Sequence, residues 1–375
     1  MIIILVIIIL VIIIHIRCSK YSSNNDSSDN IYDSGNNNDN NNNNNNNNNE
    51  VSLETIMKLK SNKNNTIQSK LTEIIDKCKY NKFIQSIHDT KYLSLLTSLY
   101  DNSCGKWLET IPKNEDVVFT NAQYTVNLCY RLFLDQPYYV SNTICNCNYK
   151  CSLDKKGIHL ICCPKNGTTI KIHDAFVNET TKIIKSAGGS AKTEVTDCLQ
   201  SLTNNSQQRT DVNYKDPPSS LFSKSLLLDM CITTIFEGVK SGKLIDVSRK
   251  LALTPFRKGL TSYNFKNNKH KQLANDNDYD FLPAVMESPS GRLDQNFKNL
   301  LKEIAKKNSE QSTNIKETIL YNYFLKRISC VFQKNLSSSF LARTGQINGK
   351  MSSFSAAPNN YIYKYSFISD FHKFT

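Results

Sequence analysis

A cluster of cysteine and histidine residues constrains the fold of this chain more than any other feature. Five of the twelve cysteines and two of the six histidines fall within residues 145–174. The spacing C-x-C…H-x3-C places two thiolates on one short turn, and an imidazole and a thiolate on a second, which suits a tetrahedral zinc ion. Such a site contributes about 10–16 kcal/mol of apparent binding energy to local folding. We therefore predict structural zinc, with ligands Cys145, Cys147, His159 and Cys163 and with Cys151 and Cys162 as substitutes.

Two other interpretations of the cysteines stay open at the level of sequence. The thiols can be small buried apolar groups that bind nothing. In a lumenal or secreted protein they can instead be half-cystines, with Cys145, Cys147 and Cys163 in disulfide bridges.

The length and charge of the chain bound its partners. The 375 residues are enough for two modest domains plus tails, and a hydrophobic fraction of 39% can form a core. The formal net charge is +13, and residues 1–50 carry −3, so the remaining chain carries +16. A basic body of this kind favours nucleic acid or an anionic membrane surface, although scattered lysines also form ordinary solvated faces. Nothing in the sequence indicates a small-molecule substrate.

The first sixteen residues are almost wholly apolar and read MIIILVIIILVIIIHI. A bilayer span needs about 20 such residues, with about 17 as a lower limit. No basic stretch precedes the run and no small-residue cleavage site follows it. We therefore predict an uncleaved single-pass membrane anchor, with Arg17 and Lys20 holding the body in the cytoplasm.

Composition and periodicity divide the rest of the chain into segments and predict an α+β or α/β fold. Helices are expected at 172–187, 294–307 and 315–334, and buried strands at 225–236 and 281–286. The predicted segments are a disordered Asn-rich linker at 17–50, a helical lead-in at 51–140, the zinc knuckle at 141–171, a mixed domain at 172–340 and a weakly ordered tail at 341–375.

Three acidic residues are candidates for metal-dependent chemistry. Asp229 lies inside the apolar run LLLDMCIT, where a carboxylate needs a partner, a hydrogen bond or a metal. Converging with Glu194 and Asp211, it could bind Mg²⁺ or Mn²⁺ and activate water against a phosphodiester. The alternatives are a lysine partner or a backbone amide for Asp229, and a turn for Asp211.

His173 and Asp174 stand together at a predicted helix start. Asp174 there complements the helix dipole. His173 is a candidate for a spare zinc ligand or an active-site base.

The order of these motifs resembles the region downstream of the polymerase domain in certain retroelement polyproteins. The similar segments, within about residues 95–340, are CGKWLETIP, YRLFLDQP, CNC, DKKGIHLICCPKNGT and IHDAFVNE. The resemblance implies a zinc knuckle followed by a restriction-endonuclease-like nuclease core. By this resemblance, Glu194 corresponds to the glutamate of that core, Asp211 to the aspartate of its Arg-Pro-Asp element and Asp229 to the aspartate of its Asp-x-x-(Ile/Val) element. It also likens FLPAVMESPSGR to the second strand of the core, which places Glu287 near the site.

The sequence departs from that family pattern at two positions. Thr210 replaces the proline, and Cys231 occupies the place of the lysine two residues after the last acid. A lysine from elsewhere, such as Lys224 or Lys250, could substitute. Without it the attacking water or transition state loses charge stabilisation. The resemblance therefore implies a shortened, divergent derivative without activity, which would be a metal-dependent endonuclease if activity survives. The alternative is a non-enzymatic, membrane-anchored interaction protein with a structural zinc site.

Overall fold

A five-stranded mixed sheet with helices on both faces forms the centre of the protein. The computed structural model describes residues 67–112, 117–137, 144–145, 147–148, 150–163, 168–200, 207–237, 239–240, 243–311 and 315–347. The strand order in the sheet is β1-β2-β3-β6-β7, and β4 and β5 form a separate two-stranded ribbon. The strands are β1 (Ala191–Gln200), β2 (Gln207–Tyr214), β3 (Leu226–Thr234), β4 (Val239–Lys240), β5 (Lys243–Leu244), β6 (Asp280–Ser288) and β7 (Arg292–Leu293). The coarse α+β prediction is confirmed.

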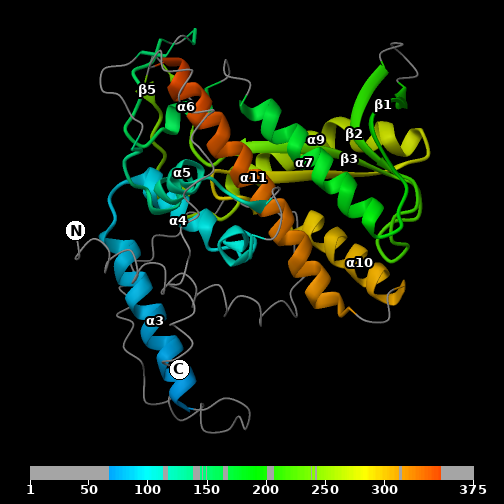
Figure 1. The fold of residues 1–375 in the computed structure, drawn as a ribbon, viewed down its shortest axis with the longest axis horizontal. Helices are drawn as coiled ribbons and strands as arrows, with labels where there is room; N and C mark the ends of the chain where they lie inside the picture. Colours follow the sequence, from blue (N-terminus) through cyan, green and yellow to red (C-terminus); the bar gives the residue numbers. More distant parts are fainter. Residues whose placement is uncertain are drawn as a thin grey trace, which may run out of the picture.

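The helices surround this sheet and extend to one side of it (Figure 1). Those before the sheet are α3 (Ile67–Ser86), α4 (Thr90–Leu99), the 3-10 turn η2 (Lys106–Glu109), α5 (Asn121–Leu132), α6 (Ile158–Cys162) and α7 (Thr168–Ser186). Those within and after it are α8 (Arg249–Ala252), α9 (Arg257–Asp276), α10 (Gln295–Gln311) and α11 (Glu317–Ile347).

The connection between β3 and β6 explains why the sheet is mixed. These two strands pair in parallel over their whole length, from Leu226↔Asp280 to Thr234↔Ser288. A parallel pair needs a crossover, and the chain between the two strands contains α8 and α9. The other neighbours, β1–β2, β2–β3 and β6–β7, are antiparallel.

Alternating side chains on the central strands divide the core between the two faces of the sheet. Leu226, Leu228 and Met230 belong to the main core, which also takes in residues of α7, α10 and α11. Leu227 and Phe281 point the other way and pack with Ala274 of α9 in a second, smaller core. Because side chains alternate along a strand, Asp229 shares the face of Leu227 and lies beneath α9.

The long helix α11 runs past several parts of the fold (Figure 1). It packs against α7, α10, α5 and η2. A buried apolar stripe at four-residue spacing makes these contacts, and its members are Phe324, Ile328, Phe332, Leu336 and Phe340. Arg327 on the same helix forms a buried ion pair with Glu179 of α7, with Nε 2.7 Å from Oε1. Removing one partner of such a pair typically costs about 3–5 kcal/mol.

The elements predicted from strongly apolar runs lie close to those observed. The elements formed by polar segments were not predicted. The expected strands at 225–236 and 281–286 correspond to β3 and β6, and the expected helices to α7, α10 and α11. The strands β1 and β2 and the helix α9 were not predicted. The predicted weakly ordered tail begins too early, because α11 continues to Ile347. The predicted linker at 17–50 and residues 348–375 lie outside the described residues.

The prediction of a single-pass membrane protein is corrected. Across the part of the chain that the structure describes, no helix combines the length and apolar character that a bilayer span requires. The helices found there are amphipathic or polar and pack against the sheet or one another. Residues 1–16, on which the anchor, the membrane partner and the cytoplasmic orientation rested, lie outside the described residues.

Candidate metal centre and carboxylate site

The four predicted zinc ligands converge on one buried point. A turn carries Cys145 and Cys147 and is closed by the Cys145 amide, which donates to the Cys151 carbonyl at 2.9 Å. The short helix α6 carries His159, and Cys163 follows directly after it. Asp154 fixes the start of α6, because its carboxylate accepts the Ile158 and His159 amides at 2.9 and 2.7 Å.

The spacing of the ligand atoms fits a tetrahedral ion. One ligand atom from each of Cys145, Cys147, His159 and Cys163 lies within 4.8 Å of all the others. Two sulfurs on one zinc ion, each about 2.3 Å from it, are about 3.8 Å apart. The Cys145 and Cys163 sulfurs are 3.7 Å apart, and Cys147 Sγ is 3.7 Å from His159 Nε2. This cluster, which we call the Cys/His cluster, could therefore hold a metal ion.

The surroundings of the cluster suit thiolate and imidazole ligands. All four residues are buried. Burial lowers the pKa of His159, which favours the neutral imidazole that a metal binds. Arg343 of α11 donates from a guanidinium nitrogen to Cys145 Sγ at 3.2 Å, which offsets thiolate charge. The proposed substitutes lie outside this group of ligand atoms; Cys162 instead contacts the Thr234 hydroxyl at 3.5 Å.

A second site lies where strands β2 and β3 separate. Their ladder pairs Val212 with Leu228, so the next opposed residues are Asp211 and Asp229. Instead of continuing the backbone pairing, Asp211 Oδ2 accepts the Met230 amide at 2.7 Å. The two carboxylates therefore lie side by side in the opening between the strands. The structure brings these two predicted residues together.

Helix α9 supplies the groups that contact Asp229. Lys266 Nζ lies 3.0 Å from Asp229 Oδ1, and His270 Nε2 lies 3.6 Å from Oδ2. Residues four apart lie on one face of a helix, so both side chains point at the sheet. Burial lowers the pKa of His270 to about 4, which leaves Lys266 as the cation of this pair at neutral pH. Sequence reasoning missed both residues, and the only signal was the K-x3-H spacing in a lysine-rich segment.

His173, in the second turn of α7, contacts the other carboxylate. Its Nε2 lies 3.2 Å from Asp211 Oδ2, and its Nδ1 lies 3.2 Å from Asp174 Oδ1. Hydrogen bonding to Asp211 raises the pKa of His173. Burial opposes the ionisation of Asp211, but the bonds from His173 and from the Met230 amide outweigh it and hold its pKa below the usual value. His173 therefore belongs to this site and not to the Cys/His cluster.

The two aspartates differ in how readily they ionise. Burial raises the pKa of Asp229, and the neighbouring charge of Asp211 adds to the effect, while Lys266 acts in the opposite direction. Two adjacent carboxylates of this kind bind either a shared proton or a cation.

Glu194 lies in the same transverse row of the sheet but has a different partner. The pairs Thr193↔Val212 and Val195↔Thr210 place Glu194 opposite Asp211 on β1. Its carboxylate is half exposed and accepts from Arg209 at 3.0 Å. Its backbone φ of 55° is in the left-handed region, which is strained for a glutamate.

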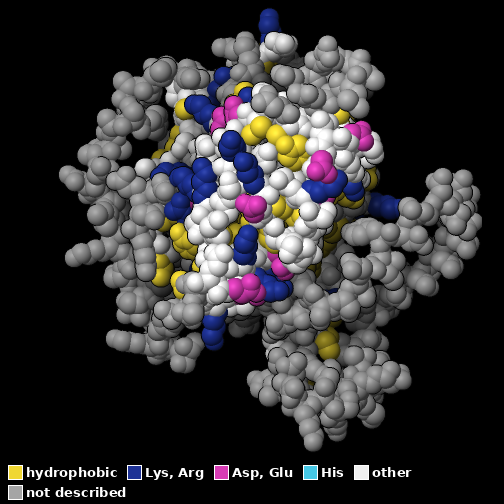
Figure 2. Space-filling view, turned by 90° about the vertical axis from the view of Figure 1, so that its right-hand side faces the viewer, with side chains coloured by type: hydrophobic (Ala, Val, Ile, Leu, Met, Phe, Trp, Pro, Cys, Tyr) yellow, Lys and Arg dark blue, Asp and Glu magenta, His cyan; other side chains and the backbone are white. Residues whose placement is uncertain are grey.

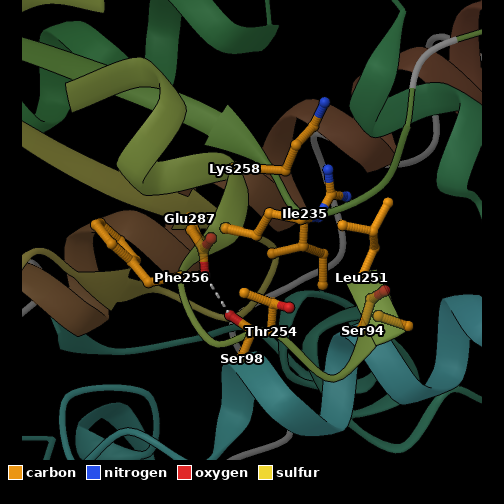
Figure 3. Close-up of a pocket in the computed structure, with 10 residues that line it drawn as sticks. Ser94, Ser98, Ile235, Leu251, Thr254, Phe256, Lys258 and Glu287 are labelled. Carbon is orange, nitrogen blue, oxygen red and sulfur yellow. Dashed lines mark hydrogen bonds between the residues drawn. The ribbon is translucent and has the colours of Figure 1, made fainter. Parts of the chain in front are cut away.

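Glu287 lies apart from the carboxylate pair. It is opposite Thr233 on β3, four residues beyond Asp229, which is about 13 Å along the strand. Its carboxylate accepts the Gly259 amide at 3.1 Å and so caps the first turn of α9. It also accepts the Ser98 hydroxyl at 2.8 Å (Figure 3). Burial raises its pKa. The cavity beside it measures about 20 Å³ and has room for about one water molecule.

The lysine alternatives from sequence do not reach the carboxylate pair. Lys224 pairs with Asp278 at 2.9 Å. Lys250 lies in the short helix α8, whereas the ammonium group beside Asp229 belongs to Lys266 of α9. The resemblance to retroelement sequences stays a prediction, because no protein-family model, no curated protein and no solved structure matches this chain.

Proposed function

We propose that this chain is a divalent-metal-dependent nuclease with a restriction-endonuclease-like sheet and a structural zinc site. The observation that carries the proposal is the pairing of Asp211 and Asp229 at the opening between β2 and β3, with Lys266 on Asp229. Two carboxylates that can hold a divalent ion, with a lysine beside them, suit metal-assisted hydrolysis of a phosphodiester.

The carboxylate pair suits a hard cation. Mg²⁺ and Mn²⁺ take oxygen ligands, and Mg²⁺ is usually held by one or two carboxylates together with substrate phosphate. Asp211 and Asp229 would hold the ion and, with Glu194, would present three carboxylates in one row. Bound there, the ion would supply an activated water and Lewis-acid stabilisation of the phosphate.

For Glu194 to join the proposed ligand set, its side chain would have to leave Arg209 and turn toward the aspartates. Its present partner is Arg209, in an exposed ion pair whose side chains are 54% and 57% accessible. Exposed pairs of this kind contribute only about 0–1 kcal/mol. A divalent ion between the aspartates would compete successfully for this carboxylate.

Lys266 takes the role of the lysine that is missing from β3. Cys231 stands two residues after Asp229, and its thiol has no positive charge to offer. Lys266 reaches the same carboxylate from α9 instead. Its ammonium group is placed to stabilise negative charge on the attacking oxygen or the phosphate. The missing lysine therefore does not argue against activity.

The role of His173 is to hold Asp211 in position. Its imidazole is not placed to serve as a metal ligand in place of the Asp211 carboxylate. Its imidazole bridges Asp211 and Asp174. This bridge holds the Asp211 carboxylate over the Met230 amide. Metal ligands in proteins are frequently oriented by a hydrogen bond to a neighbouring residue that does not bind the metal itself.

The Cys/His cluster fits structural zinc. Three thiolates and one imidazole, all buried, form a closed set with no ligand position left for water. Cys162, next to the ligand Cys163, contacts Thr234 at the end of β3. The cluster therefore braces the sheet on which the carboxylates lie, and its distinct ligand chemistry keeps zinc apart from Mg²⁺ or Mn²⁺.

The test is cleavage by the full chain, purified with zinc. Single- and double-stranded DNA and RNA are incubated with Mg²⁺ or Mn²⁺, beside Asp229→Asn, Asp211→Asn and the matched surface control Asp276→Asn. We expect metal-dependent cleavage that both site variants abolish and the control retains. Cleavage that survives in Asp229→Asn would show that the carboxylate pair is not the site and would overturn the proposal. A folded, zinc-loaded protein that cleaves nothing would also overturn it and would leave a binding domain.

A further inference from the structure

One flank of α9 is exposed next to the carboxylate pair. The face of α9 that packs on the sheet is marked by its buried residues, which are Gly259, His270 and Ala274. Ser262, Phe265 and Lys269 follow at i, i+3 and i+7 and so share a neighbouring stripe of the helix. We call these three residues the α9 flank.

One residue of the α9 flank, Ser262, contacts the sheet beside the carboxylate pair. Ser262 hydrogen-bonds Cys231, which is two residues after Asp229 on the same face of β3. Leu273, one turn beyond Lys269, packs with Val195 of β1 in the second core. The stripe that contains Ser262 therefore lies on the side of α9 toward β2 and β1, and Lys266, which is outside the flank, extends to Asp229.

Phe265 is the most exposed aromatic ring beside the site. Its side chain is 64% accessible, whereas Phe281 beneath the same helix is 8% accessible. Isolated exposed apolar side chains are common on proteins. The position of Phe265 sets it apart, because it precedes Lys266 in the sequence and shares one stripe of the helix with Lys269.

The charge around Phe265 is complementary to a polyanion. Helix α9 contains five Lys or Arg residues and one acidic residue, Asp276, which lies at its far end. Lys258 is paired with Glu237, but Lys269 is exposed on the flank itself. At the end of the molecule that carries β1 and β2, Lys and Arg side chains lie in several groups across the surface, with Asp and Glu side chains between them (Figure 2).

We propose that the α9 flank binds single-stranded nucleic acid, with an unpaired base stacked on Phe265 and a backbone phosphate near Lys269. An aromatic face binds any unstacked base, while lysines follow the backbone without regard to sequence. In a duplex the bases are already stacked and paired, so stacking on the Phe265 ring would add nothing to the affinity. The proposal names the substrate form for the carboxylate site and thus rests on the proposed function.

The experiment measures binding separately from cleavage. The full chain carries Asp229→Asn, so that no strand is cut, and no Mg²⁺ or Mn²⁺ is added. Single-stranded DNA and RNA, and the matching duplexes, are titrated by fluorescence anisotropy, with a 2-aminopurine base reporting stacking. The variants are Phe265→Ala, Phe265→Trp and Lys269→Met. The control Leu260→Ala removes an apolar side chain that is 48% accessible on the same helix but outside the stripe.

We expect Phe265→Ala to raise the single-strand Kd by roughly fivefold or more and to abolish the quenching of 2-aminopurine. Phe265→Trp retains both, Leu260→Ala changes neither, and duplex affinity is unaffected by either alanine. Lys269→Met weakens single-strand binding and lowers its salt dependence.

Equal single-strand binding by the parent and Phe265→Ala overturns the inference, as does a loss that is the same for single strand and duplex. Either result leaves the carboxylate proposal intact, because that proposal is decided by cleavage. Conversely, Phe265-dependent binding, together with no cleavage by the chain that retains Asp229, supports the α9 flank and overturns the proposed nuclease.

Discussion

Lys266 Nζ lies 3.0 Å from Asp229 Oδ1, although the two residues are 37 positions apart in the chain. One belongs to α9 and the other to β3, and only the packing of the helix on the sheet joins them. This ion pair gives the buried aspartate its compensating charge. It also restores a lysine to a site where the local sequence lacks one.

Replacement of Lys266 tests this relationship directly. We expect Lys266→Met to lower the cleavage rate by roughly 10²-fold, the typical effect of losing one group that stabilises developing charge. Without the ammonium the pKa of Asp229 rises further, since Lys266 acts against the effect of burial. The acid limb of the pH–rate profile should therefore move to higher pH. Lys271→Met, at an exposed position of the same helix, is the matched control and should leave that limb in place.

Removal of a cluster ligand should release the metal. We expect about one zinc per chain in reduced protein, measured by elemental analysis, and loss of zinc with a lower Tm in Cys147→Ser. Cys162→Ser is the control, because Cys162 adjoins the ligand Cys163 but contacts Thr234 instead. Zinc retained in Cys147→Ser, or absent from the reduced parent, would contradict the assignment of the cluster.

Glu287 should prove to be a structural residue. Glu287→Ala leaves the Gly259 amide and the Ser98 hydroxyl without their acceptor, which typically costs about 1–3 kcal/mol. Urea unfolding should show this loss. The folded variant should keep most of its cleavage rate, because the carboxylate pair lies about 13 Å away. A variant of normal stability with abolished cleavage would restore Glu287 to the catalytic set.

Asp294 should make the stability of the fold fall as pH rises. Its carboxylate accepts the Phe297 and Val285 amides at 2.8 and 2.9 Å, and burial raises its pKa to about 7. The folded state therefore holds the proton more tightly than the unfolded chain. The contribution of Asp294 to stability is complete below about pH 4 and is lost as pH rises through about 7, at about 1.4 kcal/mol per pH unit.

Urea unfolding between pH 5 and 7.5 measures this dependence. Asp294→Asn cannot titrate, so its free energy of unfolding should decline less over that range than that of the parent. Asp276→Asn, at the exposed end of α9, should follow the parent. Parallel curves for the parent and Asp294→Asn would show that Asp294 is ionised throughout.

Local patterns in the sequence predicted the elements whose causes are local. The run LLLDMCIT is strongly apolar and became β3, and the spacing C-x-C…H-x3-C brought four ligands together because short turns join them. In contrast, β2 reads QQRTDVNY and is polar along one face. A strand of that composition depends on its neighbours in the sheet, and so sequence alone favoured a turn at Asp211.

Long-range contacts account for the rest of the candidate site. Asp211 and Asp229 were predicted to converge, but their cationic partner was sought at Lys224 or Lys250, which are nearer in sequence. Helix α9 was not predicted, because its sequence is rich in lysine and asparagine and its buried face is too narrow to give a clear apolar pattern. The misplacement of Glu287 has a similar cause, since only the parallel register of β3 and β6 shows how far it lies from Asp229.

The unbroken course of α11 has a consequence for how the protein unfolds. One end of this helix packs with α10 on the sheet, and near the other end Arg343 contacts a sulfur of the Cys/His cluster. No independent hinge is expected along a continuous helix with a buried stripe. The cluster and the sheet should therefore form one cooperative unit, so that stripping the metal lowers protection from hydrogen exchange in β3 and β6 as well as around the cysteines.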